Sequence, residues 1–345
     1  MTAAVRSEDY DSFGRVTTPQ LGIIYRPSND FSLKGSWGKS FKAPTLYQNH
    51  YYVSALLYQA TALGGTGLPA DATAIYVVGG DPDLAPERAK SWTTSLAFHP
   101  DALPGLEAEL TYFRTSYTDR VILPFPSVSQ GLSNPAFAAF VDYSPTAATQ
   151  AEVIASADLF FNYSGLTYVP ENVVAILHGR YVNISRQWIK GMDLSGSYRF
   201  DVGAGRVTVR GSISRLDSSQ QSLPGQDSVQ LAGTLFNPAK VNGRFGVVWN
   251  SGGFTASTFA NYIGGLKDTR TNVEGASFST FDATLRYAFD SGLLSGLELA
   301  LSAQNLLNRE PPLHVPGPQV YRLPYDALSY SAVGRFLAFS VSKKW

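Results

Sequence analysis

The chain has 345 residues, and its 27 Lys and Arg balance 27 Asp and Glu, so net charge gives no reason for it to bind nucleic acid. It has no cysteine and only four histidines, which excludes disulfides and thiolate metal sites and leaves few catalytic bases. Charged residues make up 16% of the chain, below the roughly 25% usual for soluble domains. We expect no enzyme, no catalytic residue, no cofactor and no metal.

The start of the chain, MTAAVRSEDYDSFG, carries charges of both signs and no apolar core, so it is not a secretory signal. A chain without a signal is either cytoplasmic or lacks its beginning. No apolar run reaches the roughly 18 residues of a transmembrane helix, although alternating transmembrane strands would escape that test.

Alternation with a period of two residues recurs along the chain, which indicates β-strands with one apolar face. In one such stretch, Leu297, Leu299 and Leu301 alternate with more polar residues. Each segment is near the 9 to 11 residues that a tilted strand needs to cross a bilayer. We predict an all-β fold, a transmembrane antiparallel meander of about eleven strands, at 18–26, 31–39, 89–98, 106–117, 188–200, 206–216, 241–250, 254–262, 279–289, 297–305 and 333–345.

The connections between these segments alternate strictly between short and long. The short ones are rich in turn-forming residues and lie at 26–30, 99–105, 201–205, 251–253 and 290–296. The long ones lie at 40–88, 118–187, 217–240, 263–278 and 306–332. Outer-membrane barrels have short periplasmic turns and long extracellular loops, so the first predicted strand runs towards the periplasm.

Aromatic residues on the apolar parity collect at the ends of the predicted strands, as in the two girdles of a membrane barrel. The outer girdle comprises Trp37, Trp92, Trp188 and Tyr262. The inner girdle comprises Tyr25, Phe98, Phe200, Trp249 and Trp345, with Phe31 and Phe254 beside them. The alternative, that these rings fill the core of a sandwich, would favour positions in mid-strand instead.

The opposite parity of the same strands carries charges, which would face the lumen of a barrel. These charges alone do not identify any residue that contacts a ligand. The set is Lys34, Arg199, Arg206, Arg210, Arg244, Arg286, Asp193, Asp282, Glu107, Glu109 and Glu298.

Several motifs add to this pattern. They are SWGKSFKAPTLYQ (36–48), GDPDLAPERAKSWTTSLAF (80–98), LTYFRTSYTDRV (110–121), YVNISRQWIKGMDLSGSYRF (181–200), SAQNLLNREPP (302–312) and GRFLAFSVSKKW (334–345). Together, in this order and spacing, they resemble the C-terminal half of the barrel of TonB-dependent outer-membrane receptors. The resemblance covers essentially the whole chain.

The resemblance implies the last half of a 22-stranded barrel in the bacterial outer membrane. Intact members also hold a plug domain and a TonB box, and this chain shows neither of them, so residues 1–345 are expected to be a single C-terminal barrel domain. We expect a fragment or a truncated gene that exposes an edge at 18–26 and does not transport alone. The TonB complex would then be reached only through the missing N-terminal region.

The last strand alternates and ends in the aromatic Trp345. This ending resembles the signal that the barrel-assembly machinery reads on its clients. The expected partners are therefore outer-membrane lipid, that machinery and a small-molecule ligand, with no nucleic acid.

Function follows from the resemblance as uptake of a scarce solute, by default an iron-siderophore complex. Tyr47, Tyr51, Tyr52 and Tyr58 in the first long loop are the candidate ligand contacts, because phenol rings stack on flat or amphipathic ligands. Loop packing is an equally good explanation of these four rings. His50 beside them has no partner at metal-binding spacing. The stretch at 149–160 is the best helix candidate and would form a small lid helix in a long outer loop.

Two other classes of function stay open at this point. One is a passive porin-like or purely structural barrel, which a plug-coding region upstream in the genome would exclude. The other is a soluble β-sandwich that hydrolyses carbohydrate through a carboxylate pair. Glu107 and Glu109 share one face, but they follow a periplasmic turn, far from an external substrate.

Overall fold

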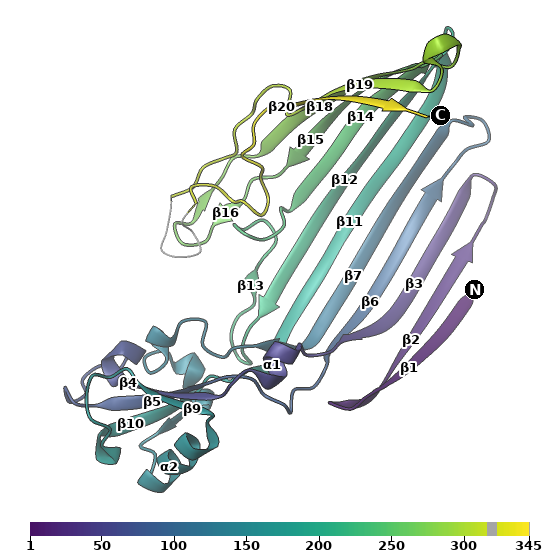
Figure 1. The fold of residues 1–345 in the computed structure, drawn as a ribbon. Helices are drawn as coiled ribbons and strands as arrows, with labels where there is room; N and C mark the ends of the chain where they lie inside the picture. Colours follow the sequence, from purple (N-terminus) through teal and green to yellow (C-terminus); the bar gives the residue numbers. More distant parts are fainter. Residues whose placement is uncertain (316–322, 345) are drawn as a thin grey trace.

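A single curved sheet forms most of the molecule (Figure 1), in a computed structural model that describes residues 1–315 and 323–344. Its 13 strands follow the order β1-β2-β3-β6-β7-β11-β12-β14-β15-β18-β19-β20, with β13 paired to β12. All neighbours are antiparallel. The bounds are β1 Thr2–Tyr10, β2 Gly14–Tyr25, β3 Phe31–Lys42, β6 Glu87–Phe98, β7 Leu106–Ile122, β11 Val182–Val202, β12 Gly205–Gln221, β13 Val229–Gln230, β14 Val241–Ser251, β15 Phe254–Ile263, β18 Phe278–Ala288, β19 Leu297–Gln304 and β20 Phe336–Lys343.

All eleven predicted strands are present, and the predicted all-β meander is confirmed. The prediction missed β1, which pairs with β2 from Thr2 opposite Gly22 to Tyr10 opposite Gly14. The expected exposed edge at 18–26 is therefore wrong, because β1 covers it. Within the described residues the sheet is open, with β1 and β20 as its edge strands.

The register of the sheet is strongly staggered. One row of paired residues starts at Tyr25, the last residue of β2, and reaches Tyr262, next to the last residue of β15, before it continues to Ser279 of β18. Because β2 runs inward and β15 runs outward, this row climbs from the inner end of the wall to its outer end. A climb of this kind is the consequence of strands that tilt by roughly 35–45° to a barrel axis. The row passes through Leu33, Leu96, Leu110, Leu194, Ile213 and Gly243.

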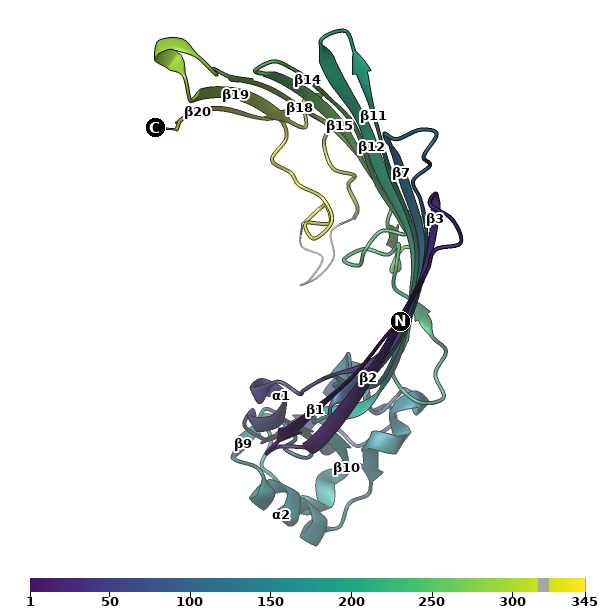
Figure 2. The same ribbon diagram turned by 90° about the vertical axis from the view of Figure 1, so that its right-hand side faces the viewer.

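The two faces of the wall differ in chemistry as the alternation predicts. Large apolar side chains such as Leu285 (48% exposed) and Phe339 (66% exposed) stand on one face with no protein over them. The charged set stands on the other face, where Lys34 of β3 reaches Glu109 of β7 across the intervening β6. This second face is the concave one (Figure 2).

The described aromatic residues of the predicted inner girdle lie at or near strand ends, as does Tyr262 of the outer girdle. Trp37, Trp92 and Trp188 lie well inside β3, β6 and β11 instead, because these strands extend farther outward than predicted. Trp37 and Trp92 are directly opposite each other in register, with ring centroids 6.0 Å apart. At the inner end, Phe31 and Phe98 are likewise paired, 4.7 Å apart. Trp345 lies outside the described residues. The girdles themselves stay a prediction, since membrane position is not a property of the chain alone.

The long connections gather at one end of the wall and most short ones at the other, as predicted. The exception is the turn at 11–13 between β1 and β2, which is short although it lies at the long-loop end. The alternation is therefore not strict. Before the last long loop, Asn305 bonds Arg309 in both directions, 2.8 Å each, and both Asn305 and Asn308 adopt positive φ, so these asparagines end β19 in a tight turn.

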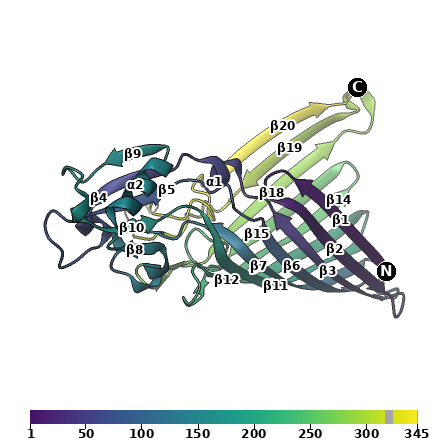
Figure 3. The ribbon, with the colours of Figure 1, turned by 90° about the horizontal axis from the view of Figure 1, so that it is seen from below.

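The first two long loops build a small folded unit, which we call the loop domain (residues 43–86 and 123–181). It contains a mixed five-stranded sheet of order β8-β10-β5-β4-β9, with α1 and α2 beside it. Figure 3 shows it beyond the outer end of the strands, away from Met1 and the end of β20. The bounds are α1 Leu46–His50, β4 Ser54–Gln59, β5 Thr73–Val78, β8 Val141–Tyr143, α2 Ala147–Ser156, β9 Leu159–Asn162 and β10 Val173–His178.

Both faces of the loop-domain sheet are covered. Ile75 and Ile176 are fully buried in a cluster that also receives Val153 and Ile154 of α2. On the other face, Leu177 packs with Phe125 and Phe137. Sequence reasoning predicted a helix at 149–160, whereas α2 spans Ala147–Ser156 with Thr146 as its N-cap and residues 159–160 belong to β9; it did not predict this sheet.

The remaining outer loops form a second cluster around Leu235, Leu266, Phe278 and Tyr330, together with the short strands β16 (Lys267–Asp268) and β17 (Val273–Glu274). Asp326 is fully buried and accepts backbone N–H bonds from Phe236 (2.6 Å) and Leu328 (2.9 Å), which ties two loops together. Burial and the nearby Asp326 raise the pKa of Tyr330 to about 12. No helix within 1–315 or 323–344 is both long enough and apolar enough to cross a bilayer.

Candidate functional site

Helix α1, which contains Tyr47 and is followed directly by Tyr51 and Tyr52, lies at the outer end of the wall, on its concave side (Figure 2). Its start is fixed by a capping box. The Thr45 hydroxyl accepts the Gln48 N–H at 3.2 Å, and the Gln48 side chain accepts the Thr45 N–H at 2.9 Å. Tyr47 and Tyr51 are four residues apart, so one helical turn brings both rings to the same face.

Three rings form the tyrosine cluster, defined as Tyr47, Tyr51 and Tyr181. Tyr47 lies 4.4 Å from Tyr51 and 6.3 Å from Tyr181, centroid to centroid. Tyr47 and Tyr51 are 55% and 45% exposed, so their rings are open to a ligand. Partial burial raises the pKa of the Tyr47 hydroxyl, and the neighbouring Tyr51 raises it further. A phenol is protonated at neutral pH with or without this shift, so the hydroxyl can donate a hydrogen bond.

The other two predicted tyrosines are placed differently. Tyr52 is 67% exposed and its ring lies 6.5 Å from Tyr51, at the margin of the cluster. Tyr58 belongs to the interior of the loop domain: it packs against the Leu63 and Leu177 core and stacks on Tyr163 at 5.4 Å. Tyr58 is thus separate from the tyrosine cluster, whereas Tyr181, which sequence reasoning did not nominate, completes it.

Two glycines allow α1 to seat against the GDPD segment. A Cβ on Gly80 would lie 2.7 Å from the Tyr51 nitrogen, and a Cβ on Gly79 would lie 2.6 Å from the Val53 Cα, so neither position has room for a side chain. The Gly80 N–H donates to the Tyr51 carbonyl at 2.9 Å. Arg180, next to Tyr181, donates to the Gly80 carbonyl at 2.8 Å and pairs with Asp81 at 3.4 Å. The cluster therefore stands on a fixed base.

Below the cluster, Glu87 joins three of the sequence motifs. Its side chain is only 6% exposed and lies 3.5 Å from the Lys42 ammonium and 3.6 Å from the Arg120 guanidinium. It also accepts the Val121 N–H at 3.3 Å. A buried carboxylate needs such partners, because burial otherwise penalises its charge. Glu87 therefore ties together the outer ends of β3, β6 and β7, from which the chain enters and leaves the loop domain.

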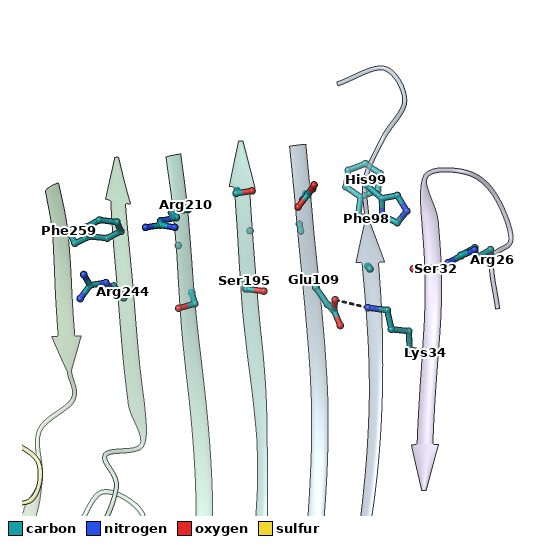
Figure 4. A pocket seen from close by; sticks show the side chains of 17 residues that line it. Arg26, Ser32, Lys34, Phe98, His99, Glu109, Ser195, Arg210, Arg244 and Phe259 are labelled. Atoms are coloured by element: carbon teal, nitrogen blue, oxygen red, sulfur yellow. Dashed lines mark hydrogen bonds and ion pairs between the residues drawn. The ribbon is translucent and has the colours of Figure 1, made fainter. Parts of the chain in front are cut away.

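The concave face of the wall forms a polar trough of about 830 Å³ near its inner end (Figure 4). Lys34 and Glu109 pair across it at 2.8 Å. On the other side, the guanidinium carbons of Arg210 and Arg244 lie 4.9 and 4.4 Å from the ring centroid of Phe259. The luminal charges are mostly paired, in Arg199–Glu107, Arg206–Asp201, Arg244–Asp282 and Arg286–Glu298.

A family model described as the TonB dependent receptor-like β-barrel matches residues 1–306. The chain belongs to the TonB-dependent receptor β-barrel family. This membership makes the curved sheet a wall of a bacterial outer-membrane barrel, and it assigns the chain to a family of receptors and transporters rather than enzymes.

Similar proteins are siderophore receptors by name. The probable TonB-dependent siderophore receptor PirA of Acinetobacter baumannii is 31% identical over 120 residues, which are 34% of this chain and 14% of that protein. The ferric enterobactin receptor PirA of Pseudomonas aeruginosa is 29% identical over 130 residues, which are 38% of this chain and 16% of that protein.

Solved receptors share the fold over nearly the whole chain. The siderophore receptor PirA from A. baumannii superposes with a TM-score of 0.63 at 18% identity, covering 98% of this chain and 42% of the receptor. A mutant ferric enterobactin receptor from P. aeruginosa in complex with enterobactin gives 0.65 at 16% identity, with coverages of 98% and 42%. The receptor chain described here thus spans about two fifths of the length of these solved receptors.

Proposed function

We propose that this chain supplies wall strands and outer loops to a TonB-dependent receptor that imports an iron-siderophore complex. The proposal rests on the tyrosine cluster, which holds exposed aromatic rings on a rigid base at the outer mouth. Aromatic rings and phenolic hydroxyls bind flat, oxygen-rich ligands by stacking and hydrogen bonding. The names of the similar receptors, which include ferric enterobactin receptors, support the ligand class.

In this proposal the chain does no covalent chemistry. The ligand first meets the loop domain and then passes along the polar trough, whose paired charges offer hydrogen bonds without one dominant sign. Energy would come from TonB through a plug and TonB box, as in the family, while residues 1–345 act as one barrel domain. The final strand would be the segment that the barrel-assembly machinery recognises.

Binding of ferric enterobactin to the purified whole protein, followed by fluorescence quenching, tests the site. Replacing Tyr47 and Tyr51 together by Ala removes two stacking rings and should weaken binding by about tenfold or more. Tyr143→Ala is the matched control, because Tyr143 is 57% exposed on the loop domain but outside the cluster. Equal affinity of the double variant and the control would contradict the proposed site.

Uptake of radioactive iron distinguishes the proposed transporter from a passive barrel. A strain without its own siderophore receptors, expressing the whole protein, should take up ferric enterobactin only when TonB is present. Uptake that is unaffected by loss of TonB would favour the porin-like alternative instead.

A further inference from the structure

Cations gather on the lipid-facing parity near the outer end of the wall, and four of them, Lys39, Lys90, Arg114 and Lys190, are set opposite one another in register; Arg88, Arg186 and Arg215 share this parity. We call the first four the cationic band. All four side chains are exposed, and they come from the neighbouring strands β3, β6, β7 and β11. They point to the same side of the sheet as Trp37, Trp92 and Trp188. Lys39, Lys90 and Lys190 each lie two residues from one of these tryptophans on the same strand, and Arg114 lies opposite Trp92 in register.

The band lies on the outer side of the Trp37–Trp92 pair. Lys39 is two residues farther out than Trp37 on β3, and Lys90 is two residues farther out than Trp92 on β6. Arg114 and Lys190 continue the register row of Trp37 and Trp92. That row climbs outward from β3 to β11, like the row from Tyr25 to Tyr262, so these two cations also lie farther out than Trp37 and Trp92. On β11 itself, Trp188 lies two residues farther out than Lys190, so the band stands between the Trp37–Trp92 pair and Trp188.

The band consists of two like-charge pairs set directly opposite each other in register. Lys39 faces Lys90 across β3 and β6, and Arg114 faces Lys190 across β7 and β11. Like charges directly opposite on one face of a sheet destabilise it. An arrangement of this kind is therefore stabilised when an anion from outside the chain lies between the cations.

No carboxylate of the described chain meets that need. None of the four cations forms an ion pair within residues 1–315 and 323–344, although Asp217 stands opposite Lys190 in register. Lys90 instead lies 5.7 Å from the centroid of Trp92. The luminal cations differ sharply, because Lys34, Arg199, Arg206, Arg244 and Arg286 each pair with a carboxylate.

We propose that the cationic band binds the phosphate groups of a phosphorylated membrane lipid in the outer leaflet. Tryptophans mark the boundary between hydrocarbon and headgroups, so cations that lie among them stand at headgroup level. Ammonium groups attract phosphate as point charges, and the Arg114 guanidinium can bind two phosphate oxygens side by side. The acyl chains would lie on the apolar face below. The proposal rests on the membrane position of the wall and is independent of the transported ligand.

Native mass spectrometry of the whole protein in detergent tests the proposal with dioleoyl phosphatidic acid as the probe and dioleoylglycerol as its uncharged counterpart. The unaltered protein should carry phosphatidic acid but not dioleoylglycerol. The band variant, Lys39→Gln, Lys90→Gln, Arg114→Gln and Lys190→Gln, should bind phosphatidic acid roughly a thousandfold more weakly.

The matched control removes the same number of charges from the luminal face: Lys34→Gln, Arg199→Gln, Arg206→Gln and Arg286→Gln. It should keep the lipid affinity of the unaltered protein. Equal loss in both variants, or no loss in either, would overturn the proposal.

Two further outcomes would overturn it in specific ways. Displacement of the lipid by an equal concentration of inorganic phosphate would show a simple anion site. Band-dependent dimerisation without lipid would show a protein partner.

Heat-dependent migration on gels reports whether each variant is a folded barrel. If the fourfold band variant does not fold, the pairs Lys39→Gln with Lys90→Gln and Arg114→Gln with Lys190→Gln are tested separately. Each should weaken binding about thirtyfold. Unchanged binding in both folded double variants would also contradict the proposal.

Discussion

The lipid-facing assignment predicts a large cost for a charge at Leu285. This side chain is 48% exposed and lies in register between Ala256 and Leu301, with no carboxylate among these neighbours. The register row that climbs outward through Trp249 of the inner girdle reaches Leu285 two strands later, by way of Ala256. Leu285 therefore lies between the two predicted girdles. An arginine there would put a guanidinium into hydrocarbon.

The magnitude follows from that depth. Arginine on the lipid face of a barrel costs about 2–4 kcal/mol at the midplane, which is about a 30-fold to 900-fold change in the folding equilibrium. Thr284→Arg is the matched control on the adjacent luminal residue, which pairs in register with Ser257 and Ser302. It should cost less than about 1 kcal/mol, because its guanidinium stays in water.

Folding of the whole protein into phospholipid vesicles, titrated with urea, measures both costs on one scale. Leu285→Arg should shift the midpoint strongly and Thr284→Arg only slightly. Equal shifts would show that the two faces are wrongly assigned, and the cationic band would then lose its place in the membrane.

Three other substitutions or conditions test the outer loops. Glu87→Gln should cost about 1.5–3 kcal/mol through loss of charged hydrogen bonds, seen as faster amide exchange at the outer ends of β3 and β7; unchanged exchange would contradict its role. Burial alone would raise the pKa of the Asp268 carboxylate, but the hydrogen bonds that Arg270 donates to it outweigh burial and lower that pKa. The ionised carboxylate therefore stabilises the fold above about pH 4, and this stabilisation is lost as pH falls through the lowered pKa. Protection of the Arg270 amide, taken relative to its intrinsic exchange rate at each pH, should fall in acid, and a flat profile of this protection would refute the prediction. Gly80→Ala should displace Tyr51 and cost about 1–3 kcal/mol, measured by thermal unfolding and by weaker ferric enterobactin binding; wild-type values would show that α1 can move.

The eleven strands could be predicted because the lipid and lumen faces of a barrel wall appear as alternation within each strand. The same logic explains why β1 was missed. Arg6, Glu8 and Asp9 interrupt any apolar stripe, so only pairing with β2 identifies this segment as a strand. A polar strand at the edge of a sheet carries little signal in its own sequence.

The loop domain and the tyrosine cluster show the limit of local patterns. Ile176 pairs with Ile75 in parallel, and no short-range spacing indicates a contact between residues so far apart in sequence. Tyr47 and Tyr51 were predicted because aromatic rings concentrate in the first long loop, whereas Tyr181 comes from the second long loop and is placed beside them where the Gly79 carbonyl accepts its N–H at 3.4 Å. The signal for Glu87 lay within the GDPDLAPE motif, but the motif alone does not show which cations approach it.

Parallel pairing in the loop domain has a consequence for exchanging loops between receptors. β5 and β4 come from the first long loop, and their outer neighbours β10 and β9 come from the second. A chimaera that receives only one of these loops would leave the buried backbone N–H and C=O groups of β5 or β10 without hydrogen-bond partners. It would also expose both hydrophobic layers of the loop domain to water. The two loops therefore have to be inherited together: recombination that moves both preserves the fold of the loop domain, and recombination between them destroys it.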